Sequence, residues 1–455
     1  MEMVIIGFLM TCGFGLLVYF LWGFLVSLRE KEFQAASRLL VMSILIPSFY
    51  IAIALLKYPF HGPVSYLLSI ITICFLFLLI SPLGSQKASM QQKIINKIDE
   101  RDTMFSRKEL VPGSPAYSAY YNKHPERKSL DDIFRKKPGL LKEGSSQYNP
   151  FQFASAGASF EIIGILKNRV EGNISSKKIQ IKESEITRYI KNWSKKLGAI
   201  DCGITELKPY HLYSVGGRAE RRDQEIINNH SYAIAFTVEM DKEMVDAAPS
   251  GAIVMESALQ YLESGTIALQ VASFIRKLGF DARAHIDGNY QVVCPLVAKD
   301  AGLGEIGRMG LLMTPHLGPR VRISVVTTDL PLLNDIPSND YSVIDFCEKC
   351  KKCADSCPSN AISFNPREEI EGSKRWKINQ EACFTLWCQL GTDCGRCIRV
   401  CPYAHPDNSF HNIIRKGLKN SSFFRYIALK MDDFLYGKKP PTIPLPKWLN
   451  IPERH

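Results

Sequence analysis

The sequence predicts an α/β protein that is preceded by three transmembrane helices and followed by a cysteine-rich domain. Long apolar stretches at the N-terminus, alternating helix-like and strand-like stretches from about residue 184, and two cysteine runs between residues 347 and 401 support this fold class. A chain of 455 residues suggests two or three units. We expect a membrane anchor over 1–83, a polar basic linker over 84–150, an α/β core over 151–340, a cysteine-rich domain over 341–405, and a C-terminal extension over 406–455 that packs on the core.

The expected anchor contains three apolar stretches, which are Met3–Leu28, Leu39–Leu56 and Tyr66–Ile80. A helix that crosses the hydrocarbon core of a bilayer needs roughly 20 apolar residues. Glu2 stands where a signal peptide would be basic, and the first stretch is longer than a signal peptide requires, so both features argue against cleavage. No Arg-Arg pair precedes that stretch, which argues against twin-arginine export.

The charges between the apolar stretches predict their orientation. Arg29, Lys31 and Arg38 lie between the first two stretches, whereas only Lys57 and His61 lie between the second and third. Basic loops favour the cytoplasmic side, so we expect a multi-pass inner-membrane protein whose later domains face the cytoplasm. Much of the formal charge of +11 follows the third stretch, where a basic flank at the lipid bilayer explains it; no nucleic-acid partner is expected.

The remaining sequence mixes helix and strand patterns. Prolines interrupt residues 84–150 at several positions, so no long element is expected there. Tyr232–Val238 and Val321–Thr328 are rich in β-branched residues, as strands are. Ser184–Leu197 and Val254–Leu278 have helical apolar spacing. A helix between two strands predicts an α/β sandwich.

Two cysteine runs have the spacing of iron–sulfur ligands. The stretch FCEKCKKCADSCP at 346–358 contains C-x2-C-x2-C-x3-C-P, and a second run ends in Cys401-Pro402. In two-cluster ferredoxins the last cysteine of such a run ligates the other cluster. We expect one 4Fe–4S cluster on Cys347, Cys350, Cys353 and Cys401, and another on Cys357, Cys394, Cys397 and one upstream thiolate, for which Cys383 is preferred to Cys388.

Zinc and disulfide bonds are the alternative explanations for these cysteines. Zinc sites also use C-x2-C pairs, but they rarely need two runs that each end in Cys-Pro. Disulfide bonds are disfavoured at the expected cytoplasmic location. Both alternatives therefore rank below two iron–sulfur clusters.

A glycine-rich stretch supplies a more specific motif than the cysteines. Residues 301–331 read AGLGEIGRMGLLMTPHLGPRVRISVVTTDLP, and residues 383–402 read CFTLWCQLGTDCGRCIRVCP. Together with HPDNSFHN at 405–412 and MDDFLYGKKPP at 431–441, they resemble the cobalamin-dependent reductive dehalogenase family over about Ser184 to Pro441. The resemblance implies a nitroreductase-like cobalamin-binding core joined to a bacterial ferredoxin-like domain with two 4Fe–4S clusters. It also implies a small organohalide substrate and a low-potential electron donor, which the sequence does not identify.

The stretch GLGEIG at 302–307 also satisfies the dinucleotide-binding motif G-x-G-x-x-G. That motif must follow a strand directly, and the preceding VAKDA does not look like one. The glycines are better explained by a backbone that passes close to a flat ligand. By resemblance this ligand is the corrin ring, and the expected cofactor-binding residues are Gly302, Leu303, Gly304, Gly307 and Arg308.

The resemblance also places Tyr261, Arg322 and Asn289 around the substrate. Reductive cleavage of a carbon–halogen bond leaves carbanion character that must receive a proton. A phenol with a pKa of about 10 is protonated at neutral pH and can donate. An adjacent guanidinium stabilises the phenolate, and an amide can orient the tyrosine or the substrate. We expect Tyr261 to be the proton donor.

Two other functions fit the same motifs less well. Epoxyqueuosine reductases share the cobalamin and two-cluster plan and use a catalytic aspartate, but Gly288 rather than Asp287 aligns with that position. A non-catalytic membrane iron–sulfur electron carrier would bind two clusters and no cobalt. Respiratory dehalogenases carry a twin-arginine signal and use a separate anchor protein, so this chain departs from them on both points.

Overall fold

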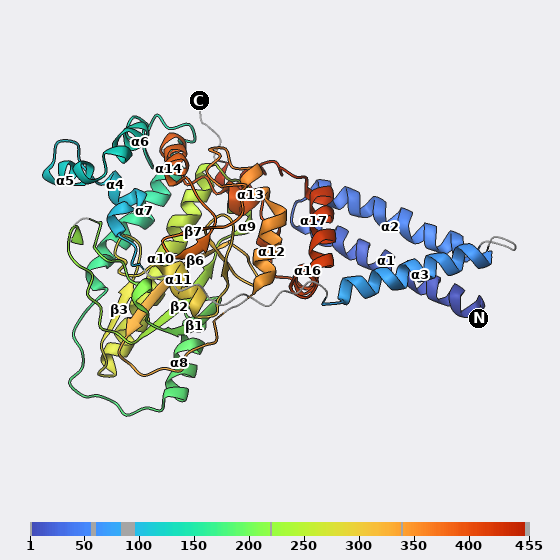
Figure 1. Cartoon of the computed structure of the whole chain (residues 1–455), viewed down its shortest axis with the longest axis horizontal. Coiled ribbons are helices and arrows are strands. Elements are labelled where there is room, and N and C mark those ends of the chain that lie inside the picture. The colour runs from blue at the N-terminus through green and yellow to red at the C-terminus, as the bar shows by residue number, and fades with distance from the viewer. Residues whose placement is uncertain (1, 56–60, 83–95, 219–220, 338–339, 451–455) are drawn as a thin grey trace. The chain divides into compact units, whose positions relative to one another are not determined.

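The computed structural model describes residues 2–55, 61–82, 96–218, 221–337 and 340–450 (Figure 1). Its internal contacts divide the chain into two compact units. The helical unit comprises Met1–Lys87, Tyr341–Cys350 and Pro406–Pro440, and the α/β unit comprises Ala88–Asp340, Lys351–His405 and Pro441–His455. The five-segment division of the sequence stays a prediction. Its anchor limit at 83, the start of its linker, and the expected stretch end at Leu56 fall outside the described residues.

Three long helices form the N-terminal part of the helical unit. They are α1 (Glu2–Arg29), α2 (Phe33–Ala54) and α3 (His61–Ile80). Within the described ranges, these three helices are long and apolar enough to cross a membrane, which confirms the predicted number of apolar helices. The third helix starts five residues before the predicted Tyr66, so it reaches 20 residues.

Three later helices complete this unit: α12 (Tyr341–Cys350), α16 (Ser409–Asn420) and α17 (Ser422–Tyr436). Helix α16 places Phe410 against α1 so closely that a Cβ on Gly23 would lie 2.8 Å from the ring. Helix α17 is held by α2 and α3, because Arg38 donates to the Leu435 carbonyl at 3.3 Å and Ser421 Oγ donates to the Leu78 carbonyl at 3.1 Å. Residues 406–440 of the expected C-terminal extension are grouped with this unit.

A four-stranded antiparallel sheet organises the α/β unit, within the described residues. Strands β2 (Tyr232–Glu239) and β6 (Val321–Thr328) are central and match the two predicted strands. Strands β1 (Asp201–Glu206) and β3 (Ala282–His285) form the edges in the order β1-β2-β6-β3. Two small ladders lie outside this sheet: β4 (Glu305–Ile306) with β5 (Leu312–Met313), and β7 (Glu368–Ile370) with β8 (Ser373–Arg375).

Helices cover both faces of this sheet (Figure 1). The α10 helix (Gly251–Lys277) packs on β2, β3 and β6, α8 (Glu183–Lys196) packs on β1, and α7 (Pro150–Leu166) packs on α10. The α11 helix (Cys294–Asp300) packs on the other face. Alternate β2 residues serve the two cores: Ile234 and Phe236 face the α10 side, and Ala233 and Ala235 face the α11 side. The short α9 (Lys242–Asp246) precedes α10.

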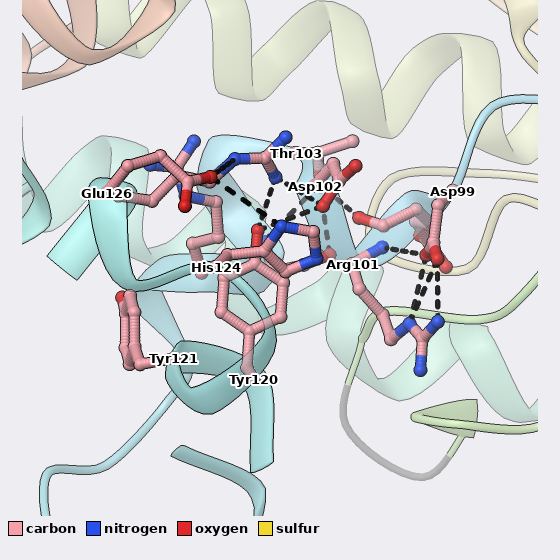
Figure 2. A network of polar contacts seen from close by, with 12 residues as sticks. Asp99, Arg101, Asp102, Thr103, Tyr120, Tyr121, His124 and Glu126 are labelled. Atoms are coloured by element: carbon pink, nitrogen blue, oxygen red, sulfur yellow. Dashed lines mark hydrogen bonds and ion pairs between the residues drawn. The ribbon is translucent and has the colours of Figure 1, made fainter. Parts of the chain in front are cut away.

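The predicted linker contains short helices rather than an open chain. They are η1 (Glu100–Asp102), α4 (Met104–Lys108), α5 (Pro115–Lys123) and α6 (Pro125–Arg135). Prolines open α5 and α6, because a residue at the first helical position needs no backbone N–H. Figure 2 shows a polar network here, in which Tyr120 Oη donates to Asp102 at 2.9 Å and Arg101 Nη2 donates to Asp99 at 2.7 Å.

A buried arginine ties this segment to a helix of the cysteine-rich region. Arg107 Nε donates to Asp131 at 2.9 Å, and its Nη1 donates to Glu381 at 2.7 Å. Glu381 lies at the start of α14 (Gln380–Leu390), the helix that carries Cys383 and Cys388. Glu381 is partly exposed, but the guanidinium that it binds is buried, so loss of this bond would leave a buried charge with fewer partners. The contact therefore holds α14 against the segment.

Candidate functional site

The structure brings together two of the three predicted catalytic residues. Tyr261 lies on α10 and Arg322 lies on the neighbouring strand β6. The guanidinium carbon of Arg322 is 5.1 Å from the centre of the Tyr261 ring, which is a cation–π contact. In the part of the chain that the structure describes, the Tyr261 hydroxyl makes no hydrogen bond. A phenol O–H beside a cation is thus available to a ligand.

Arg322 is fixed by two residues that sequence reasoning missed. Its Nη2 donates to Ser257 Oγ at 2.6 Å and lies 3.3 Å from Asp393 Oδ2. Its Nη1 contacts the Met240 sulfur at 3.2 Å. Its Nε is buried and, among the described residues, has no hydrogen-bond partner. An unpaired buried N–H is costly unless a ligand accepts from it, so this atom marks a place for a bound acceptor.

The surroundings of Tyr261 keep its hydroxyl protonated. Burial raises the pKa of Tyr261, Arg322 lowers it in part, and Asp287 and Asp393 raise it further. The side chain nevertheless keeps partial exposure, as does Tyr290, whose pKa is also raised by burial. Both side chains are therefore surrounded by protein yet still reached in part by solvent. An accessible phenol with a raised pKa is a proton donor at neutral pH.

Asn289, the third predicted residue, is occupied by protein groups. Its Oδ1 accepts from Arg283 Nη2 at 2.7 Å, and its Nδ2 donates to the Lys167 carbonyl at 3.2 Å. Asp287, two residues earlier, is within electrostatic reach of both Tyr261 and Arg322. Burial raises the pKa of Asp287 against the opposing effect of Arg218 and Lys167.

The predicted cofactor-binding stretch is used by the protein itself. A Cβ on Gly304 would lie 2.2 Å from the Met313 carbonyl oxygen, and one on Gly302, which has φ +81°, would lie 2.7 Å from the Ile336 carbonyl oxygen. The close approach that these glycines permit is therefore to other protein backbone. The helix α11 precedes them, so the strand that a dinucleotide motif needs is replaced by a helix.

The side chains of this stretch are also engaged. Leu303 is buried in the core on the α11 face of the sheet. Arg308 is 1% exposed and donates to the Ser363 carbonyl at 2.6 Å and the Asn365 carbonyl at 3.0 Å. Gly307 N donates to the Leu311 carbonyl at 2.9 Å within the β4–β5 hairpin. A flat ligand at this stretch would meet a stiff backbone surface rather than free side chains.

Four of the predicted cluster ligands gather in the α/β unit. They are Cys357, Cys383, Cys394 and Cys397. Burial, and then the neighbouring Cys357 and Cys394 thiols, raise the pKa of Cys383 to about 12. Burial and the thiols of Cys353, Cys394, Cys383 and Cys357 raise the pKa of Cys397. Cys357 Sγ accepts from the Ala361 N–H at 3.2 Å, as cluster thiolates do. Four converging thiols with such a bond fit an iron–sulfur cluster.

The two candidates for the eighth ligand point to different surroundings. Cys383 and Cys388 are five residues apart on α14, which places them on different faces of the helix. Cys388 is 2% exposed and packs in an apolar cluster with Met104, Phe134 and Phe384. The electrostatic influence of Cys357 and Cys394 on Cys383 favours it over Cys388.

The remaining predicted ligands lie in different units. Cys347 and Cys350 are on α12 of the helical unit. Cys353 is on α13 (Lys352–Asp355) of the α/β unit, α13 packs against α15 (Arg396–Arg399), and Cys401 follows α15. The assignment of Cys347, Cys350, Cys353 and Cys401 to one cluster stays a prediction.

Comparison with known proteins shows which proteins the chain resembles. The model for a 4Fe-4S dicluster domain matches residues 346–405. The fold resembles that of the catabolic reductive dehalogenase NpRdhA in complex with 3-bromo-4-hydroxybenzoic acid, with a TM-score of 0.61 and 26% identity over 77% of this chain and 48% of that chain. It also resembles a reductive dehalogenase whose structure suggests a mechanism for B12-dependent dehalogenation, with a TM-score of 0.58 and 27% identity over 69% of this chain and 46% of that chain.

Sequence relatives point to the same class. The chain is 34% identical to the tetrachloroethene reductive dehalogenase of Sulfurospirillum multivorans over 291 residues, which are 56% of this chain and 58% of the relative. It is 25% identical over 213 residues, 42% of this chain and 68% of the relative, to an epoxyqueuosine reductase of Leadbetterella byssophila. The chain spans about half the length of the dehalogenases that it matches.

These comparisons test several of the predictions made from the sequence. They confirm the resemblance to reductive dehalogenases, which are oxidoreductases, and the distant resemblance to epoxyqueuosine reductases. They also confirm a 4Fe–4S ferredoxin-like domain next to a mixed helix and sheet fold of the dehalogenase type.

Proposed function

We propose that this protein is a membrane-anchored, cobalamin-dependent reductase that removes a halogen from a small organohalide. The observation that carries the proposal is the Tyr261–Arg322 pair. Among the described residues, its partly exposed phenol makes no hydrogen bond, and the buried Nε of Arg322 beside it has no partner. The relative from Sulfurospirillum multivorans and both solved structures are dehalogenases by name, and one of these structures holds 3-bromo-4-hydroxybenzoic acid. The pair has the groups that protonation of a developing carbanion needs.

The proposed reaction replaces a carbon–halogen bond by a carbon–hydrogen bond. When bound, reduced cobalamin and the iron–sulfur clusters would supply the electron pair that breaks the carbon–halogen bond, and the halide leaves. Tyr261 then gives its proton to the carbon, and solvent returns a proton to the phenolate. Arg322 stabilises the phenolate while it exists, because its positive charge lies over the ring. Asn289 contributes by holding the turn that contains Asp287 and Gly288.

The cofactors would be held by two regions of the chain. Two 4Fe–4S clusters are proposed. The first would bind Cys347, Cys350, Cys353 and Cys401, which the spacing of the cysteines in the sequence supports. The second would bind Cys357, Cys383, Cys394 and Cys397, which the electrostatic interactions among these thiols support. The corrinoid would lie in a nitroreductase-like core, against the backbone of Gly302, Leu303, Gly304, Gly307 and Arg308. The electron donor is a low-potential carrier that has yet to be identified.

The helical unit would anchor the protein in the inner membrane and place the α/β unit on the cytoplasmic side. Arg29 at the end of α1, Lys31 between α1 and α2, and Arg38 in α2 support this orientation. The exposed face of α17 supports an interfacial location, because Tyr426 and Phe434 are each about half exposed and flank the exposed Lys430. Aromatic rings and lysines favour the headgroup region of a bilayer, so this face would lie in that layer.

Reduction of a non-halogenated substrate, as in epoxyqueuosine reductases, is the second candidate. Asp287 lies within electrostatic reach of Tyr261 and Arg322, so a second acid lies near the phenol. This candidate predicts turnover of an epoxide without halide release. It also predicts that Asp287→Asn removes activity while Tyr261→Phe retains it.

Anaerobic purification followed by metal and turnover assays tests the proposal. The full chain is reconstituted with iron, sulfide and cobalamin, and iron and cobalt are measured per chain. We expect about eight irons and one cobalt, with halide release from chlorinated ethenes or brominated phenols under a chemical reductant. Iron at the level of one cluster would contradict the two-cluster part. Fully loaded protein that releases no halide from either substrate class, but reduces an epoxide, would replace the first candidate by the second.

A further inference from the structure

Three segments that are far apart in the sequence meet at the Arg322 side chain. Ser257 comes from α10, Asp393 from the loop before Cys394, and Arg322 from β6. Ser257 Oγ donates to Asp393 Oδ2 at 2.5 Å and accepts from Arg322 Nη2 at 2.6 Å. Arg322 Nη2 is also 3.3 Å from Asp393 Oδ2. The three groups therefore form a closed polar triangle.

This triangle is shielded from solvent. Ser257 is 3% exposed, and the side chains of Arg322 and Asp393 are 14% and 12% exposed. Thr392, which is fully buried, donates its hydroxyl to the Asp393 carbonyl at 3.1 Å and so braces the loop. Charge-assisted bonds in such surroundings hold side chains firmly, because the loss of one partner leaves a buried charge unpaired.

The triangle also determines where the positive charge of Arg322 lies relative to the Tyr261 ring. Ser257 and Tyr261 are four residues apart on α10, so they share a face of the helix. Arg322 reaches across from β6 to both of them, through a hydrogen bond to Ser257 and through the ring contact with Tyr261. A shift of the guanidinium away from Ser257 would move it off the Tyr261 ring.

We propose that Ser257 and Asp393 are positioning residues that hold Arg322 over the Tyr261 ring, and that Asp393 thereby joins the loop of Cys394 to the proton donor. The donor role of Tyr261 rests on the proposed function, whereas the positioning of Arg322 does not. Asp393 is followed directly by Cys394, a predicted cluster ligand. The residue that bonds Arg322 is therefore adjacent in sequence to a ligand of the proposed cluster.

A purely structural role of Ser257 and a positioning role predict different changes in the pKa of Tyr261. Arg322 lowers the pKa of Tyr261 more strongly than Asp393 raises it. Ser257→Ala removes no charge, so its effect on Tyr261 must come through the two charged groups that it bonds, Arg322 and Asp393. A shift of Arg322 raises the pKa of Tyr261, whereas a shift of Asp393 lowers it. If Ser257 positions Arg322, this variant raises the pKa of Tyr261 by about 0.5–1 pH unit.

Fluorine NMR of 3-fluorotyrosine at position 261 measures this shift. The full-length chain is purified anaerobically with its clusters and without corrinoid, and the label is titrated from about pH 7 to about pH 11. We expect a rise in Ser257→Ala and a value near that of the parent protein in Ser257→Thr, which keeps the hydroxyl. Thr266→Ala is the matched control, because it removes an α10 hydroxyl that bonds only to the Glu263 carbonyl.

An unchanged or lowered pKa in Ser257→Ala would overturn the positioning role. If that variant fails to fold, Asp393→Asn is measured in the parent protein and in Arg322→Met. In Arg322→Met only the loss of the negative charge acts, and it lowers the pKa of Tyr261; in the parent protein a release of Arg322 opposes that change, so a smaller fall or a rise supports the positioning role and an equal fall overturns it. Because the assay needs neither corrinoid nor organohalide, a protein that shows the shift but releases no halide would retain the positioning role and lose the proposed reaction.

Discussion

The Tyr261–Arg322 pair and the glycine-rich stretch at 302–308 were both predicted as parts of one site, yet their chemical groups are used differently. In the pair, the Tyr261 hydroxyl and Arg322 Nε make no hydrogen bond to the described residues. In the glycine-rich stretch, Arg308 bonds two carbonyls and Gly304 is packed against the Met313 backbone.

This difference distinguishes groups that are available for a reaction from groups that stabilise the fold. Groups that the fold leaves unpaired in a partly exposed place are available to a ligand, whereas groups that the fold already pairs hold the protein together. Substitutions at the Tyr261–Arg322 pair are therefore expected to lower turnover, whereas substitutions in the glycine-rich stretch are expected to lower the free energy of unfolding.

Removal of the Tyr261 hydroxyl gives the largest expected effect. Tyr261→Phe should lower turnover by about 10²–10⁴-fold, because the proton donor is lost, with unchanged cluster and corrinoid spectra. Halide release under a chemical reductant measures this loss. Tyr290→Phe is the control, since it removes a neighbouring buried phenol outside the arginine contact; equal losses in both variants would contradict the assignment of Tyr261.

Replacement of the two α14 cysteines extends the comparison to the clusters. Cys383→Ser should lose about half of the bound iron, because one cluster loses a ligand. Cys388→Ser should keep all of it, since Cys388 packs among apolar side chains. Iron analysis and electron paramagnetic resonance of the reduced proteins measure the outcome, and the opposite pattern would exchange the two cysteines.

The Gly304→Ala variant tests support rather than chemistry. A Cβ at this position would collide with the Met313 carbonyl oxygen, so the free energy of unfolding should fall by about 2–4 kcal/mol. Gly157→Ala on α7 is the matched control, because open space surrounds its Cβ position and alanine favours helices. Thermal unfolding of the two variants in detergent compares their stabilities. Equal stability would show that the backbone around Gly304 and Met313 shifts to accommodate the methyl group.

A smaller loss of stability is expected at Arg308. Arg308→Met keeps the apolar stem but leaves the Ser363 and Asn365 carbonyls without their donor, which should cost about 1–3 kcal/mol. Denaturant unfolding measures this loss. If the variant instead unfolds like the parent protein but binds corrinoid more weakly, Arg308 acts on the cofactor directly.

The pH dependence of turnover should show the smallest change of all. Because burial raises the pKa of Tyr261, its hydroxyl stays protonated as the pH rises through the range in which most enzymes are assayed. Turnover should therefore stay level from about pH 7 to about pH 9. An alkaline decline within that range, which is absent in Tyr261→Phe, would show that the phenol ionises early and would contradict the raised pKa.

The local elements of the fold could be read from the sequence where short-range patterns decide. Strands β2 and β6, helix α10 and the three apolar helices match their predicted stretches because each pattern reflects burial along one element. Strands β1 and β3 were missed because they are short and carry no clear alternation. The antiparallel order of the sheet depends on how distant strands pair, which local patterns do not specify.

The sequence by itself determined the spacing of the cysteines and the lengths of the apolar stretches, because both are properties of neighbouring residues. Tertiary structure alone decided which cysteine of α14 faces the other thiols, and which residues surround Arg322. Ser257 and Asp393 are separated by 136 positions, so only the folded chain could bring them to the same guanidinium. Contacts between distant segments depend on the packing of the whole unit, and no short pattern encodes them.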